Sequence, residues 1–232
     1  MMEELGGKIY WAVLFDMDGT LYDQRRLRLH MALALVGACL LHPSAVRQLQ
    51  TIASFRRMRE AGGTVGGKDG FEAAQYAAVG EKLGLSPQKV RETVEKWMYR
   101  VPLRYLPHCR DERMAALIGR LRKSGTAVIV YSDYPAEEKL AALGLTADWC
   151  FSASDGEIAC LKPDPRGIQA VLATTGHSPE ECLYIGDRDE KDGASARSVG
   201  MDYLILPKGR RNRADLFSKI RRPAGTSQKE VR

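Results

Sequence analysis

Two carboxylates stand one residue apart at the end of an apolar run, in the segment VLFDMDGTLYD at residues 13–23. Asp16 and Asp18 would repel each other at the end of a buried strand, so a proton or a metal cation must offset their charge. Gly19 and Thr20 follow at once, in a pattern typical of a tight turn. This stretch predicts a site whose acidic groups react or hold a cation.

Two further segments carry polar side chains of a complementary kind. Ser132 and Asp133 follow the apolar run TAVIVY, and Lys162 stands in CLKPDP ahead of a predicted helix. The hydroxyl of Ser132 and the ammonium group of Lys162 are suited to holding phosphate oxygens. These segments therefore predict an anion-binding part of the same site.

A second acidic pair follows the apolar run CLYI, where Asp187 and Asp192 stand five residues apart. Three or four carboxylates without a histidine form a donor set that suits a hard cation such as Mg²⁺. The cation would screen a phosphate dianion from an attacking carboxylate. One carboxylate could then attack phosphorus to form an acyl phosphate, while a second protonates the leaving oxygen and later activates water.

The elements that must position these residues alternate between helix and strand after residue 105. Such alternation is typical of a parallel sheet with helices on both faces. The carboxyl ends of its strands lie along one edge, where open α/β sheets build their sites, so the polar side chains should meet there. We predict strands at 8–15, 126–131, near 149–152, 182–185 and 202–206. We predict helices at 110–123, 136–143, 164–175 and 190–198.

Residues 25–105 show only helical periodicity, with helices predicted at 26–41, 44–60, 71–83 and 87–99. The predicted fold is therefore α/β, a Rossmann-like three-layer core with a parallel sheet plus an all-helical cap insertion. Residues 1–24 and 106–206 form the core, residues 25–105 form the cap, and residues 207–232 form a basic, flexible tail.

The predicted cap is basic, with fourteen Lys and Arg against six Asp and Glu. We hypothesise that one or two of its basic residues, with Arg56 and Lys68 as candidates, reach over the phosphate crevice and contact substrate. The alternative is an ordinary solvated helix surface. The tail is also basic, but no aromatic residues are interleaved for stacking on bases, so a nucleic-acid partner is not expected.

The 232 residues are 44% hydrophobic and 28% charged, as in ordinary globular proteins. The apolar run at 31–41 is shorter than the roughly 18 residues of a membrane span, so no membrane partner is expected. The five cysteines are scattered and none has metal-ligand spacing. We therefore expect these cysteines to be reduced thiols in a cytoplasmic protein.

Four motifs together resemble those of the haloacid dehalogenase-like phosphatase superfamily, in the same order. They are DMDGTLYD at 16–23, VIVYSD at 128–133, LKPDP at 161–165 and YIGDRDEKDGASARSVGM at 184–201. The predicted helical insertion is similar to the cap of that superfamily's class-one members.

The resemblance implies a role for each matching residue. Asp16 matches the nucleophile and Asp18 the general acid and base, whereas the superfamily's dehalogenases lack the second acid. Ser132 and Lys162 match the phosphate-binding pair. Asp133 departs from the pattern, because asparagine is common there; it would contribute to substrate binding, or its side chain would cap the helix predicted at 136–143.

The resemblance also implies the ligands of Mg²⁺. Asp187 matches the carboxylate that binds the ion alongside Asp16 and the backbone carbonyl of Asp18. Asp192 matches a second acid that supports the ion directly or through water.

The predicted activity is Mg²⁺-dependent hydrolysis of small phosphate monoesters through an aspartyl-phosphate. The partner would be a small phosphorylated metabolite of the phosphoglycolate, sugar-phosphate or nucleotide type. A phosphomutase uses the same aspartyl-phosphate, and a non-catalytic phosphate-binding protein could keep the fold. The sequence does not separate a hydrolase from a mutase. The intact set of acids, serine and lysine argues against the binding protein, because a protein that only binds has no need of Asp18.

Overall fold

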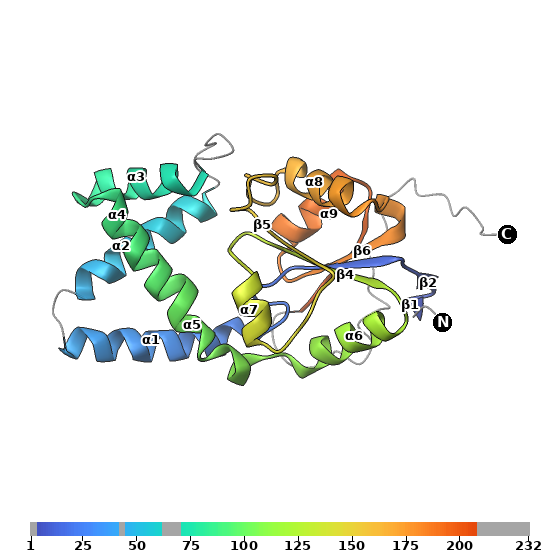
Figure 1. Ribbon diagram of the computed structural model, residues 1–232, viewed down its shortest axis with the longest axis horizontal. Coiled ribbons are helices and arrows are strands. Elements are labelled where there is room, and N and C mark those ends of the chain that lie inside the picture. The colour runs from blue at the N-terminus through green and yellow to red at the C-terminus, as the bar shows by residue number, and fades with distance from the viewer. Residues whose placement is uncertain (1–3, 42–44, 62–70, 208–232) are drawn as a thin grey trace.

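A five-stranded parallel sheet in the order β5-β4-β3-β6-β7 forms the centre of the molecule (Figure 1). The structure, a computed structural model, describes residues 4–41, 45–61 and 71–207. The strands are β3 (Ala12–Phe15), β4 (Ala127–Ser132), β5 (Trp149–Ser152), β6 (Cys182–Gly186) and β7 (Asp202–Ile205). Phe15, the last residue of β3, lies opposite Val130 of β4 and Ile185 of β6, so the three central strands end within two residues of one another.

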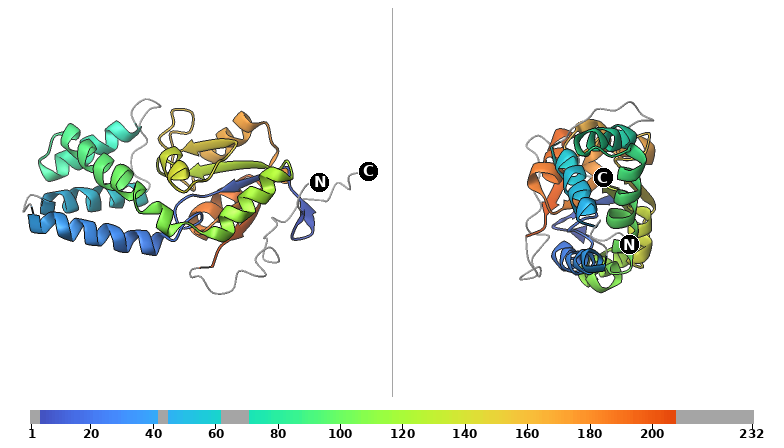
Figure 2. Two further views of the ribbon diagram at one scale, coloured as in Figure 1. Left: turned by 60° about the horizontal axis from the view of Figure 1, so that its bottom comes forward. Right: turned by 90° about the vertical axis from the view of Figure 1, so that its left-hand side faces the viewer.

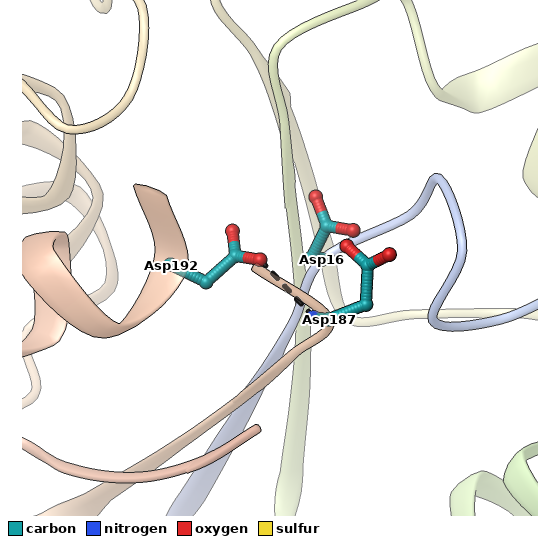
Figure 3. A group of neighbouring side chains, drawn as sticks. All are labelled: Asp16, Asp187 and Asp192. Atoms are coloured by element: carbon teal, nitrogen blue, oxygen red, sulfur yellow. Dashed lines mark hydrogen bonds between the residues drawn. The ribbon is translucent and has the colours of Figure 1, made fainter. Parts of the chain in front are cut away.

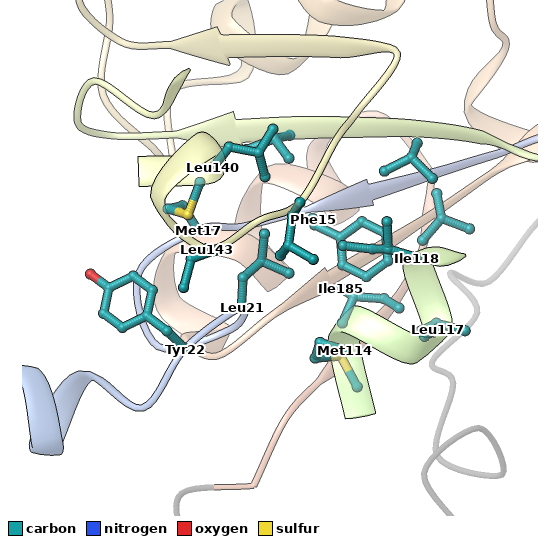
Figure 4. Packing of buried hydrophobic residues seen from close by; sticks show 14 of the residues in the cluster. Phe15, Met17, Leu21, Tyr22, Met114, Leu117, Ile118, Leu140, Leu143 and Ile185 are labelled. Atoms are coloured by element: carbon teal, nitrogen blue, oxygen red, sulfur yellow. The ribbon is translucent and has the colours of Figure 1, made fainter. Parts of the chain in front are cut away.

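Helices cover both faces of this sheet. They are α6 (Glu112–Lys123), α7 (Glu137–Ala142), α8 (Pro165–Thr175) and α9 (Ala194–Ser198). Side chains alternate across each strand. Phe15 packs in one cluster with Leu117 of α6 (Figure 4), and Val13 belongs to the same cluster. Leu14 packs on the other face with Ile168 of α8. The predicted α/β, Rossmann-like three-layer core is confirmed.

The chain between β3 and α6 is helical and lies beyond one edge of the sheet (Figures 1 and 2). Its helices are α1 (Gln24–Leu41), α2 (Ala45–Glu60), α3 (Phe71–Leu83), α4 (Pro87–Val94) and α5 (Val101–Leu103), with a π-helical turn at Glu95–Arg100 before α5 and a 3₁₀ turn at Leu106–Cys109 after it. Phe55, Val79 and Val94 are fully buried in a separate apolar cluster here. Among the described helices, none is both long and apolar enough to cross a bilayer.

The predicted strand at 8–15 is in fact two strands, which corrects that prediction. Gly6 and Gly7 have φ values of 60° and 81°, and they turn the chain into a short antiparallel hairpin of β1 (Glu4–Leu5) and β2 (Lys8–Ile9). Positive φ values at both turn positions suit glycine in such hairpins. The sheet strand β3 starts only after this hairpin.

Candidate active site

Side chains from the ends of β3, β4 and β6 meet at one edge of the sheet. They line a cavity of about 660 Å³, which also receives residues from α1 and α2. Gly19 lets the loop after β3 come close to the loop after β6, because a Cβ at Gly19 would lie 2.4 Å from Asp187 Oδ2. The Gly19 φ of +97° likewise favours glycine.

Three carboxylates converge in this cavity (Figure 3). Asp16, Asp187 and Asp192 each offer one oxygen, and these oxygens lie within 4.8 Å of one another. The buried Oδ1 atom of Asp187 accepts no hydrogen bond from any described residue. A buried carboxylate oxygen without a donor is costly, so this cluster fits a divalent cation held by oxygen ligands.

Lys162 crosses from the loop before α8 into the same cluster. Its Nζ atom donates to Asp16 Oδ1 at 2.5 Å and to Asp192 Oδ1 at 2.7 Å, with the Tyr184 hydroxyl at 3.2 Å. Burial disfavours the charged ammonium group, but the carboxylates of Asp16 and Asp192 outweigh this effect and raise the pKa of Lys162. Lys162 is therefore a buried cation beside Asp16.

Burial also shifts the pKa values of the acids in the cluster. It raises the pKa of Asp16, which Lys162 lowers and Asp192 raises further. Burial, with the nearby charge of Asp192, raises the pKa of Asp187 to about 6. Asp192 Oδ2 accepts hydrogen bonds from the backbone N–H groups of Asp187 and Arg188, which fix its position. A bound cation would relieve the repulsion among these acids.

Asp18 lies beside the cluster and has two partners that the sequence analysis missed. Its Oδ1 atom accepts hydrogen bonds from Lys139 Nζ at 2.7 Å and from the Tyr22 hydroxyl at 2.5 Å. Burial alone would raise the pKa of Asp18, but Lys139 and Tyr22 lower it. Tyr22 stands four residues after Asp18, a spacing that offered a local signal. Lys139 comes from α7 and no sequence spacing pointed to it.

Ser132 and Asp133 both lie at the end of β4. Ser132 is buried, and its Oγ atom accepts a hydrogen bond from the backbone N–H of Tyr134. Asp133 lines the cavity, where its Oδ1 atom accepts from the backbone N–H of Lys162 and its Oδ2 atom pairs with Lys191. It does not cap α7, whose N-terminus has no side-chain cap.

The basic candidates from the helical part differ in position. Arg56 is exposed on α2 and is not among the residues that line the cavity, and Lys68 lies outside the described residues. Arg25 and Arg28 at the start of α1 do line it. Their guanidinium groups make no ion pair with any described residue, so they are available to an anion in the cavity.

Arg59 is buried instead of facing the cavity. Its side chain is 2% exposed and joins the helical part to the core, because it donates to Glu72 at 3.0 Å and to the backbone carbonyl of Asp133 at 2.5 Å. Glu60, one residue further, pairs with Arg188 at 3.0 Å. These contacts connect α2 to the loops that carry the site.

Comparison with known proteins identifies one family and several related phosphatases. A family model described as haloacid dehalogenase-like hydrolase matches residues 10–200. A phosphoserine phosphatase of Thermus thermophilus is 30% identical over 134 residues, which cover 56% of this chain and only about half (52%) of that protein. A phosphoglycolate phosphatase of Xylella fastidiosa is 27% identical over 92% of this chain and 88% of its own length.

The fold also has solved counterparts. A HAD hydrolase of Bacillus subtilis bound to magnesium superimposes with a TM-score of 0.56 at 19% identity. The superposition covers 86% of this chain and 89% of that one. At this level of identity the likeness concerns the fold alone.

Proposed function

Because this chain belongs to the haloacid dehalogenase-like hydrolase family, we propose that it hydrolyses small phosphate monoesters through a phosphorylated Asp16. The observation that carries the proposal is the convergence of Asp16, Asp187 and Asp192 within 4.8 Å, with Lys162 on Asp16 and a second acid, Asp18, beside them. Attack, charge neutralisation and proton transfer each have a group in place.

The first step forms the acyl phosphate. A carboxylate oxygen of Asp16 attacks phosphorus, and the bond from phosphorus to the ester oxygen breaks. Asp18 gives its proton to the departing alkoxide, which leaves as an alcohol. Lys162 and Ser132 bind phosphate oxygens and keep phosphorus in line with Asp16.

The second step releases phosphate. Asp18, now ionised, takes a proton from a water molecule whose oxygen attacks phosphorus, and the bond to Asp16 breaks to regenerate the free carboxylate. Asp16, Asp187 and Asp192, with the backbone carbonyl of Asp18, would hold Mg²⁺. When bound, that ion would neutralise negative charge on the carboxylates and the phosphoryl oxygens.

Two arginines of the cavity could bind an ester whose organic part is also anionic. Arg25 and Arg28 line the cavity without an ion-pair partner among the described residues. Both phosphoglycolate and phosphoserine, the substrates in the names of two relatives, carry a carboxylate. Within the predicted range of substrates, we therefore place small phosphorylated carboxylates first.

The helical part would act as a cap on this site. We assign residues 1–24 and 106–206 to the catalytic core and residues 25–105 to the cap, whose movement would admit substrate and exclude water. Its contacts with the core support this role, because Arg59 and Glu60 bind the loops that hold Asp133 and Arg188.

A panel of phosphate esters tests the proposal. Released phosphate is measured with and without Mg²⁺ for the wild type and for Asp16→Asn, with folding of the variant checked by circular dichroism. Mg²⁺-dependent release that the variant loses is the expected result, because an amide cannot attack phosphorus. Full activity in Asp16→Asn would refute the mechanism, and conversion of a sugar phosphate to its isomer without phosphate release would identify a mutase.

A further inference from the structure

One face of α1 is apolar and exposed along most of its length. Leu29, Leu33, Val36 and Leu40 expose 63%, 63%, 58% and 82% of their surfaces. At 3.6 residues per turn, these four positions fall within a sector of about 60°. Residues 31–41 contain no charged side chain. A helix face that stays in water normally carries charged residues, so this face is suited to being covered.

The exposed apolar surface is large enough for a stable contact. Three further apolar residues, Leu41 of α1 and Val46 and Leu49 at the start of α2, lie at the same end of the helical part and expose 76%, 52% and 38% of their surfaces. Leu41 stands about 80° round the helix from the edge of the stripe. If an extended residue exposes roughly 160 Å², the seven residues leave on the order of 700 Å² in water. Stable interfaces bury about 800 Å² per partner, so the area matches one protein partner.

The spacing of the stripe is self-complementary. The intervals between Leu29, Leu33, Val36 and Leu40 are four, three and four residues, which read the same in both directions. This is also the spacing of a two-helix seam. We propose that a second copy of this chain covers the face, through antiparallel pairing of the two α1 helices. Leu29 then packs on Leu40 of the partner subunit, and Leu33 packs on Val36 of the partner subunit.

Charge selects the antiparallel arrangement. Arg26 is exposed in the first turn of α1 and does not line the cavity, whereas the last turn of α1 carries no basic residue. Antiparallel pairing brings Arg26 beside the C-terminus of the other α1, where free carbonyl groups carry partial negative charge. Parallel pairing would place the two copies of Arg26 against each other. A two-fold contact of this kind is also the commonest form of protein self-association.

Sedimentation equilibrium over a concentration series tests the proposal. We expect twice the chain mass of 25.7 kDa for the wild type. The double substitution Leu33→Glu and Leu40→Glu should weaken the dimer by at least about 100-fold, because it would bury carboxylates in an apolar contact. Ile9→Glu is the matched control, since Ile9 is 51% exposed on β2, away from α1; it should leave the dimer intact.

Three outcomes would overturn the proposal. They are a wild type that stays monomeric at the highest concentration, a dimer that the α1 substitutions leave intact, and a monomer that binds anionic lipid vesicles through this face. Circular dichroism checks that the double variant folds. We expect it to fold, because both substituted positions are exposed.

Cross-linking tests the register. In a Cys39→Ser background, the pair Leu29→Cys and Leu40→Cys should be joined between chains by a short bismaleimide. Either single substitution should not, because antiparallel pairing separates the two copies of residue 29 by about 16 Å along the axis. Cross-linking of the Leu29→Cys variant alone would overturn the antiparallel register.

Discussion

Lys139 Nζ lies 2.7 Å from Asp18 Oδ1, and the two side chains are 8% and 17% exposed. This ion pair lowers the pKa of Asp18 against the effect of burial. As a general acid Asp18 must carry a proton. Lys139 should therefore control the pH range in which the proposed acid can work, although it does not itself line the cavity around Asp16.

Removing the ion pair should move the pH profile. In Lys139→Met the pKa of Asp18 rises, so the protonated acid persists to higher pH. We expect the alkaline fall of kcat/KM for an alkyl phosphate to move up by about one pH unit, since a hydrogen bond to a charged group contributes about 1.5–3 kcal/mol. An aryl ester with an acidic phenol needs no proton at its leaving oxygen and should show no such shift.

Lys123→Met is the control for the loss of one positive charge, since Lys123 is exposed at the end of α6. It should leave the profile in place. Tyr22→Phe removes the second donor and should move the profile in the same direction by less. An unchanged profile in Lys139→Met would contradict control of Asp18 by this ion pair.

The acidic cluster could be predicted because its residues follow strands directly. Parallel strands end at one edge, so Asp16 and Asp187 needed only the topology to meet. Lys139 could not be found in this way, because its contact with Asp18 spans 121 residues and depends on how α7 packs. Arg59 shows the same limit, because its contact with the backbone carbonyl of Asp133 spans 74 residues and depends on how α2 packs against the core.

Asp187 should govern the response to a divalent cation. Its pKa of about 6 in the fold exceeds its ordinary value of 3.8, so the folded state holds the proton more tightly than the unfolded chain. Without a cation, stability should therefore fall as pH rises from about 4 to 6 and should not recover above that range. Mg²⁺ should raise Tm more at pH 8 than at pH 5, because protons compete for the same carboxylate.

Asp187→Asn should remove both the fall in stability with rising pH and the response of Tm to Mg²⁺. In EDTA at pH 8 we expect this variant to be more stable than the wild type by about 1–2 kcal/mol, a value reduced for the partial exposure of Asp187. Its Tm should respond little to Mg²⁺ in a thermal-shift assay. Asp189→Asn is the control, because Asp189 pairs with Arg197 away from the cluster. A wild-type Tm that Mg²⁺ leaves unchanged at pH 8 would contradict the cation site.

The two arginines of α1 should determine which esters are bound. Arg25→Ala and Arg28→Ala should each raise KM for phosphoglycolate by about tenfold, since a charge-assisted hydrogen bond contributes about 1.5–3 kcal/mol. The kcat value should change little, and so should the KM for an alkyl phosphate whose organic group is uncharged. Arg26→Ala is the matched control, because Arg26 is exposed and does not line the cavity. Equal losses for charged and neutral esters would contradict a role in recognising the second anion.

Arg59 should stabilise the fold and should also hold the proposed cap against the core. Its guanidinium binds Glu72 and the buried Gln75 Oε1 atom at 3.0 Å each, and it also binds the backbone carbonyl of Asp133. Arg59→Leu leaves these acceptors without their donor, so we expect a loss of about 3–5 kcal/mol in the free energy of unfolding. Chemical denaturation measures this loss, and Arg57→Leu, an exposed neighbour on α2, should cost far less.

A double-mutant cycle separates the ion pair from the rest of the Arg59 contacts. Glu72 binds Ser154 of the core at 2.7 Å as well as Arg59, so Glu72→Gln weakens the same connection from its other side. If the pair acts as a unit, the two substitutions together should cost less than their separate losses combined, with a coupling of about 1–3 kcal/mol. Loss of the connection should also raise KM for every ester alike, because the cap would close less often over the site. Additive losses with an unchanged KM would mean that Arg59 fills space between α2 and the core without holding the cap closed.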